Sequence, residues 1–277
     1  MVSQTENTLA PASAAPAGHA TAGPFGEDGA VAARLAVSSL LPFYPKTISS
    51  DGKLQPENLF CITGALAGFA AQYAVRQELA DAGGIDAHAA LLTRSPGAPI
   101  DPTVHAEGVV IVQTPNDERY YFSDRINRLL LPDRLESLSA FSVIGGQAMR
   151  LGAAKSDLPD CFTILDRAVN TLGTPEFGAI RAPAGHVPAM PSRRAVEIFW
   201  PATLTAFSRE PQSPVPGFKL LSPRLWPVAL AMIAATYMEM VKGMLAPALA
   251  LTIFMEAALP MSKIDQAAVR FVRDTAH

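Results

Sequence analysis

The carboxy-terminal third of the chain constrains the fold most, because two long stretches of it carry no charged residue. They cover 225–238 and 243–255. Each is shorter than the roughly 20 apolar residues that cross a bilayer, and a helix that is apolar on every side belongs in a protein interior. The pattern therefore predicts two buried helices within 223–259. A break between Gly243 and Pro247 separates them, because proline disturbs the helical turn that precedes it.

A further buried helix is predicted over 56–79, where Pro56 suits an early helical position and apolar residues recur at helical spacing. Gly64 and Gly68 lie on its flattest face, four residues apart, and small residues at this spacing allow another helix to approach closely. The spacing favours packing inside the molecule. An oligomer interface is the alternative.

One β-hairpin is predicted between these helices. β-Branched residues at 104–113 and an aromatic segment at 119–122 flank turn-forming residues at 114–117, and Ser123 or Asp124 then caps a short helix. Other helices are expected over 31–40 with an end before Pro42, from Asp157 to Leu172, from Ser192 until Pro201 bends or ends it, and after Ser262. On the helix from Asp157, the residues expected to face inward are Leu158, Phe162, Leu165 and Val169.

These elements predict an α-dominated α+β fold, with central buried helices and one β-hairpin or small antiparallel sheet. Residues 1–28 are rich in Ala and Pro and predict a disordered tail. Residues 29–277 are expected to form a single helix-rich globular domain, because the apolar helices on either side of the internal loops need each other. A split near residue 180 is the alternative.

Composition limits the classes of function. Hydrophobic residues make up 49% of the chain and charged residues only 17%, so few charged side chains are available for the surface of a monomer. A subunit interface would bury the excess of apolar surface. The net charge of −3 and the scattered basic residues argue against nucleic-acid binding. Cys61 and Cys161 have no metal-binding or redox spacing. The amino terminus lacks a secretory signal and no segment spans a membrane, which makes a cytoplasmic location the expectation.

Candidate site residues are few. Polar groups inside an apolar wall are typical of small-molecule sites, and those next to the predicted buried helices are Gln72, Arg76, Glu239, Lys242 and Glu256. His105 and Glu107 lie on one face of the predicted strand and could share a metal ion, although a metal site needs further ligands. For each group, an ordinary structural role is the simpler interpretation.

Two functions from different classes follow. The first is a non-catalytic cytoplasmic protein that acts by association, as a subunit, adaptor or scaffold, with a protein partner or a second copy of itself. The second is an enzyme or small-ligand binder with a polar site between the buried helical elements. The sequence contains no Gly-rich phosphate loop, GxSxG or HExxH motif. It identifies neither a reaction nor a cofactor.

Overall fold

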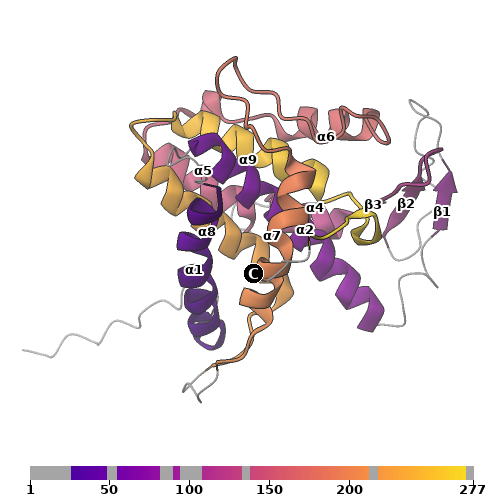
Figure 1. Ribbon diagram of the computed structural model, residues 1–277, viewed down its shortest axis with the longest axis horizontal. Coiled ribbons are helices and arrows are strands. Elements are labelled where there is room, and N and C mark those ends of the chain that lie inside the picture. Colours follow the sequence, from indigo (N-terminus) through magenta and orange to yellow (C-terminus); the bar gives the residue numbers. More distant parts are fainter. Residues whose placement is uncertain are drawn as a thin grey trace, which may run out of the picture.

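The computed structural model describes residues 26–48, 55–81, 90–93, 108–132, 138–211 and 218–272. Among these residues, helices form the body of the molecule and a small sheet lies at one side of it (Figure 1). The elements are α1 (Gly26–Ile48), α2 (Pro56–Asp81), β1 (Ala90–Thr93), β2 (Val110–Gln113), β3 (Arg119–Phe122), α4 (Asp124–Leu130), α5 (Ala140–Arg150), α6 (Cys161–Asn170), α7 (Ser192–Ser208), α8 (Trp226–Met240) and α9 (Pro247–Met261). The α-dominated α+β class is confirmed.

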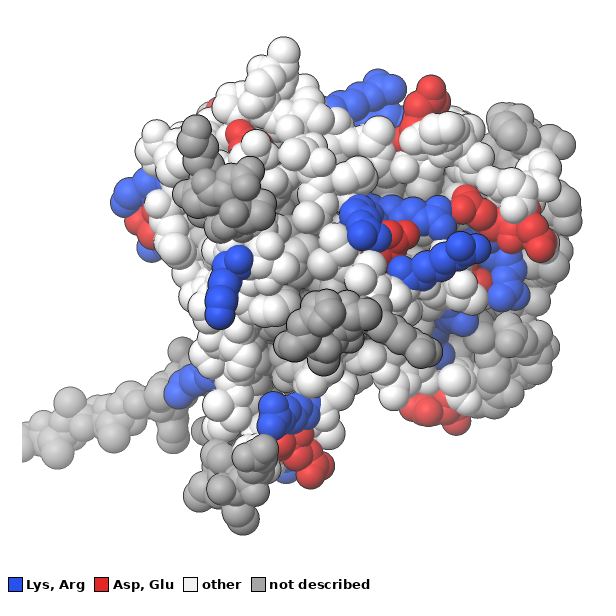
Figure 2. All heavy atoms as spheres, viewed as in Figure 1, with Lys and Arg blue, Asp and Glu red and all other residues white. Residues whose placement is uncertain are grey.

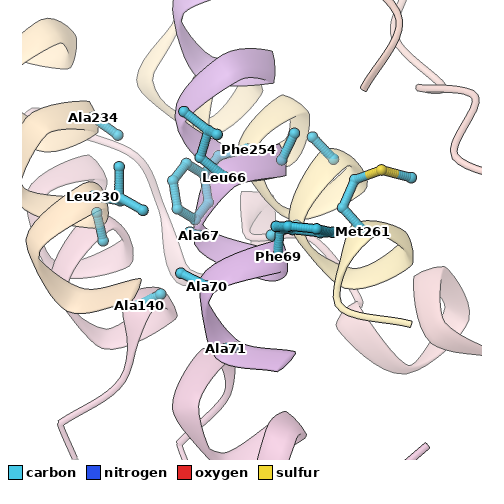
Figure 3. Close-up of a cluster of buried hydrophobic side chains, with 14 of the residues drawn as sticks. Leu66, Ala67, Phe69, Ala70, Ala71, Ala140, Leu230, Ala234, Phe254 and Met261 are labelled. Carbon is cyan, nitrogen blue, oxygen red and sulfur yellow. The ribbon is translucent and has the colours of Figure 1, made fainter. Parts of the chain in front are cut away.

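Helix α2 is the centre of the helical body, with α8 on one side and α9 on the other (Figure 3). Its glycines touch the backbone of α9. A Cβ atom added at Gly64 would lie 2.9 Å from the carbonyl carbon of Phe254, and one at Gly68 would lie 2.8 Å from that of Ala258. Both distances are shorter than real Cβ atoms show. The glycine pair therefore packs inside the molecule, as the sequence predicted.

Both carboxy-terminal helices are buried, also as predicted. Nearly all of α8 from Trp226 to Met238 is enclosed, as is α9 from Ala250 onward. Within the described ranges, α2 alone has the length and composition of a membrane span, and 94% of its apolar window is buried by the surrounding helices. Those properties are also the ones expected for the core helix of a folded domain.

The predicted hairpin is present and carries additional strands. Strands β2 and β3 pair antiparallel, whereas β1 pairs parallel to β2, which gives the order β1-β2-β3. On the other edge of β3, Tyr120 forms an antiparallel bridge with Ile264, which follows α9. Of the two expected caps, Ser123 accepts a hydrogen bond from the backbone N–H of Arg125 and caps α4, whereas Asp124 is the first residue of the helix. The hairpin is thus attached to the carboxy-terminal segment.

Two helices continue through prolines that were expected to end or bend them. Helix α1 contains Pro42 and Pro45 and reaches Ile48, and α7 extends seven residues past Pro201, to Ser208. A proline inside a helix leaves the carbonyl four residues earlier without its usual donor. For Pro45 that carbonyl belongs to Leu41 and accepts from the hydroxyl of Tyr237 at 2.6 Å. For Pro201 it belongs to Glu197 and accepts from the N–H of Val272 at 3.0 Å.

The prediction for α6 was wrong in its start and its register. The helix begins at Cys161 and is capped by Asp160. The carboxylate of Asp160 accepts hydrogen bonds from the backbone N–H groups of Phe162 and Thr163. Asp157 instead belongs to a short 3₁₀ turn. The buried face is also offset by one residue from the expected one, so Phe162 is 79% exposed while Ile164 and Ala168 face the core.

The helix expected after Ser262 does not form in the described residues. Ser262 ends α9, and its hydroxyl donates to the carbonyl of Leu259 at 2.7 Å. Residues 263–265 are extended beside β3, and only the 3₁₀ turn Gln266–Ala268 follows. Pairing with the sheet edge takes the backbone groups that a helix would have used. Of the predicted tail, residues 1–25 lie outside the described residues, whereas 26–28 form the start of α1, so the boundary at residue 28 was wrong.

Candidate functional site

A buried carboxylate organises the region where β3, α2 and the segment after α9 meet. Asp265 is almost fully buried, and its carboxylate accepts from Arg76 at 2.7 Å and from Arg119 at 3.0 Å. The hydroxyl of Tyr121 adds a long contact of 3.5 Å, and the Arg76 guanidinium lies 4.6 Å above the tyrosine ring. A buried charge is tolerated when it is paired and hydrogen-bonded. Asp265 meets both conditions with groups from two other elements.

A cleft opens next to this carboxylate. It has a volume of about 330 Å³, at the lower end of the range for small-molecule sites. Figure 2 shows basic and acidic side chains lying side by side over this part of the surface, near β3 of Figure 1. The cleft is lined by Gln113, Asp117, Arg119, Asp265, Ala267 and Ala268. Its walls offer carboxylate, amide and guanidinium groups, which suit a small polar ligand.

Lys263 lies two residues before the carboxylate and is 1% exposed. Its Nζ donates to the side-chain oxygen of Asn127 at 2.5 Å and lies 5.6 Å from the centre of the Phe122 ring. Burial lowers the pKa of Lys263 to about 7, and the charge of Asp124 opposes this shift only in part. The side chain is thus an amine that gains or loses its proton near neutral pH.

Two of the predicted binding residues, Gln72 and Arg76, are neighbours on α2. Arg76 belongs to the Asp265 cluster. Gln72, one helical turn earlier, is fully buried, and neither its amide nitrogen nor its oxygen has a hydrogen-bond partner among the described residues. Such a group costs stability unless it is satisfied. We find no chemical role for Gln72 beyond this position.

The other three predicted residues lie in different places. Glu239 and Lys242 form an exposed ion pair of 2.7 Å, and the hydrogen bond from Lys242 lowers the pKa of Glu239. Glu256 is buried and pairs with Arg167 of α6. Burial raises the pKa of Glu256, and the bond from Arg167 opposes the shift. The five residues therefore do not line one pocket, and close contact at Gly68 leaves no room for a ligand between α2 and α9 at that level.

The proposed metal ligands cannot be placed. His105 and Glu107 lie outside the described residues. Within the part of the chain that the structure describes, no three His, Cys, Asp or Glu side chains lie together as a metal site would require. The thiols of Cys61 and Cys161 are buried, and burial raises the pKa of each to about 12. Neither thiol is poised as a nucleophile.

A second surface feature lies at the carboxyl ends of α5 and α8. Glu239 joins the two ends, because it accepts from Gln147 at 3.2 Å and lies 3.6 Å from Arg150. Three exposed methionines lie next to these residues in the sequence, because Met149 precedes Arg150, Met240 follows Glu239 and Met244 lies two positions after Lys242. The methionine surface consists of Met149, Met240 and Met244, which are 48%, 66% and 64% exposed.

Comparison with known proteins adds no functional information. No protein-family model, curated protein or solved structure matches the chain. Function therefore has to be argued from the cleft and from the methionine surface alone.

Proposed function

We propose that this protein acts by association, as a subunit, adaptor or scaffold, and that it binds its partner through the methionine surface. The supporting observation is the exposure of three methionines that neighbour in sequence the residues of one polar contact between α5 and α8. Methionine is flexible and polarisable, which allows it to fit varied apolar partners. An exposed apolar patch with a polar rim is typical of protein interaction sites.

The rim supports a polypeptide as the partner. Arg150 and Lys242 are both largely exposed and flank Glu239, so the rim offers two cations and one anion. A partner with apolar side chains beside acidic residues would match it. The buried free thiols, Cys61 and Cys161, fit a reducing compartment, and we extend the proposal to a cytoplasmic location on that ground.

Site-specific photocrosslinking in living cells tests this proposal. A photoreactive amino acid at Met240 or Met244 should give a covalent adduct with another polypeptide. The same group at Val187, which is 56% exposed in a distant loop, is the matched control and should give none. Equal labelling at Val187, or no adduct at either methionine, would refute the methionine surface as the interface.

Light scattering of the purified chain then separates the two kinds of partner. A second copy of the chain predicts a dimer or larger species that Met240→Glu converts to a monomer. A distinct partner predicts that the purified chain is a monomer. The crosslinked adduct should then be heavier than the chain by the mass of the partner, which differs from the 29.3 kDa of a second copy.

The cleft supports a second candidate function, the binding of a small polar molecule. The favouring observation is the cavity that Arg119 and Asp265 line together with Gln113 and Asp117. A ligand that binds the folded state raises the melting temperature. We expect at least one compound in a panel of polar metabolites to do so, and Gln113→Leu in the cleft wall to weaken its binding in calorimetry. A panel without any stabilising compound would count against this function.

A further inference from the structure

Residues 263–265 act as a short additional strand on the edge of β3. The contacts are a hydrogen bond from the N–H of Tyr121 to the carbonyl of Lys263 at 2.7 Å, the bridge between Tyr120 and Ile264, and a hydrogen bond from the N–H of Asp265 to the carbonyl of Arg119 at 3.0 Å. Side chains alternate along an extended segment. Lys263 and Asp265 therefore share one face, which is turned towards the helical body, where both are buried.

The two buried ionisable side chains on this face, Lys263 and Asp265, differ in whether they have a partner of opposite charge. Asp265 is neutralised by two arginines, Arg76 and Arg119. Lys263 has the neutral amide of Asn127 and, 5.6 Å from Nζ, the ring of Phe122, and it takes part in no salt bridge among the described residues. The charged and titratable groups on the elements around it are Asp124, Arg125 and Arg128 of α4, Arg76 and Glu78 of α2, Arg119 and Tyr121 of β3, and Asp265 itself.

Most of these groups are already committed to other partners. Arg125 pairs with Glu78 at 2.7 Å, and Arg76 and Arg119 both pair with Asp265. Asp124 is the acidic group that favours a proton on Lys263, and its effect is smaller than that of burial. A protonated Lys263 is therefore a weakly compensated charge at the centre of the contact between the segment and α4.

We propose that residues 263–265 form a clasp that protonation of Lys263 opens, which releases the carboxy-terminal segment from the edge of β3. A free ammonium is far better hydrated than a buried one, so the proton favours the open form. Opening also exposes the unpaired backbone groups of β3, an edge to which another strand can add. The clasp thus couples pH to the accessibility of the sheet edge and of the cleft that Asp265 lines.

The expected size of the effect follows from the two protonation states. In the closed form the pKa of Lys263 is about 7, and in the open form it returns to the ordinary 10.5. Proton binding then favours opening as pH falls towards 7, and the effect levels off below it. Between pH 8.5 and pH 6 the opening equilibrium should increase about 30-fold.

Hydrogen exchange of single backbone N–H groups measures this opening. The N–H groups of Tyr121 and Asp265 report on the clasp directly, because both bond across it. The N–H of Val241, which bonds to Tyr237 at 2.9 Å in the last turn of α8, is the control. After correction for intrinsic exchange, the first two should lose protection about 30-fold between pH 8.5 and pH 6, and the control should not. Unchanged protection at all three, or an equal loss at Val241, would overturn the clasp.

Two variants test whether Lys263 is the titrating group. Lys263→Met keeps an apolar chain of similar length without the charge, and should remove the pH dependence of exchange at Tyr121. Asn127→Asp puts a carboxylate against Nζ and should keep the clasp protected down to pH 6, because an opposite charge stabilises the ammonium. The second variant keeps the inference testable if the first does not fold. A wild-type pH profile in either variant would refute the role of Lys263.

Discussion

The contact between α2 and α9 makes a strong prediction for Gly68→Ala. The added Cβ would lie 2.8 Å from the carbonyl carbon of Ala258, whereas ordinary contact begins at 3.4 Å. The two backbones must therefore move apart by at least 0.6 Å, the difference between these distances. The obstacle is the backbone of a buried helix, so no side chain can rotate to make room.

The free-energy cost follows from packing. A gap of about 0.5–1 Å loses a quarter to a half of the dispersion energy of each affected contact, and overpacking a core costs about 1–3 kcal/mol. We expect the upper end, about 3 kcal/mol, because the fully buried Leu66 and Phe69 lie within the same turns of α2. Alanine returns about 1 kcal/mol through its higher helix propensity. Gly68→Ala should therefore lower the free energy of unfolding by about 2 kcal/mol.

Gly146→Ala is the matched control. Gly146 also lies inside a helix, α5, but a Cβ added there meets nothing within 4 Å. Only the propensity gain applies, so this variant should be more stable than wild type by about 0.5–1 kcal/mol. Urea denaturation followed by circular dichroism measures both variants, with an unchanged slope m required for the comparison. A Gly68→Ala protein as stable as Gly146→Ala would refute the close packing of α2 against α9.

Three further predictions concern single groups. Tyr237→Phe removes the donor to the carbonyl that Pro45 leaves free, and should cost about 1–2 kcal/mol in urea denaturation; the cost should shrink in a Pro45→Ala background, where a backbone N–H returns. Ser139→Ala removes the buried N-cap of α5 and should cost about 1 kcal/mol by the same assay. Burial raises the pKa of Cys61 from 9.0 to about 12, so the neutral thiol contributes stability that is fully present below pH 9. This contribution is lost as pH rises towards 12. The stability difference between wild type and Cys61→Ala should therefore fall by about 1 kcal/mol from pH 9 to pH 10.

The core helices could be predicted because their signal is local and repeated. Every turn of α2 and α9 presents apolar or small side chains, so burial follows from composition alone. The close packing of α2 could be predicted from a local signal as well, because Gly64 and Gly68 lie four residues apart and leave one face of the helix flat. By contrast, α6 is amphipathic and carries apolar residues at adjacent positions, so an error of one residue in its buried face placed Phe162 in the core, whereas it is exposed.

The charged cluster could not be predicted, because its partners are far apart in the sequence. Arg76 was a candidate, but Asp265, which it contacts, lies 189 positions away. Lys263 was missed altogether. In the sequence it follows an apolar helix and resembles any solvated lysine, and only its contact with Asn127, 136 positions earlier, shows that it is buried. Glu239 and Lys242, by contrast, lie three positions apart, and they form the salt bridge that this short spacing allows.

The prolines show how a correct local rule can give a wrong boundary. The rule that proline removes a helical hydrogen bond predicted an end before Pro42 and a bend or an end at Pro201, whereas α1 runs through both Pro42 and Pro45 and α7 runs through Pro201. The rule assumes that the freed carbonyl has no other donor. Here the hydroxyl of Tyr237 and the N–H of Val272 supply one, each from a distant part of the chain. The extent of α1 and α7 is therefore set by tertiary structure, and the same donors fix how α8 and the carboxy-terminal segment dock against those helices.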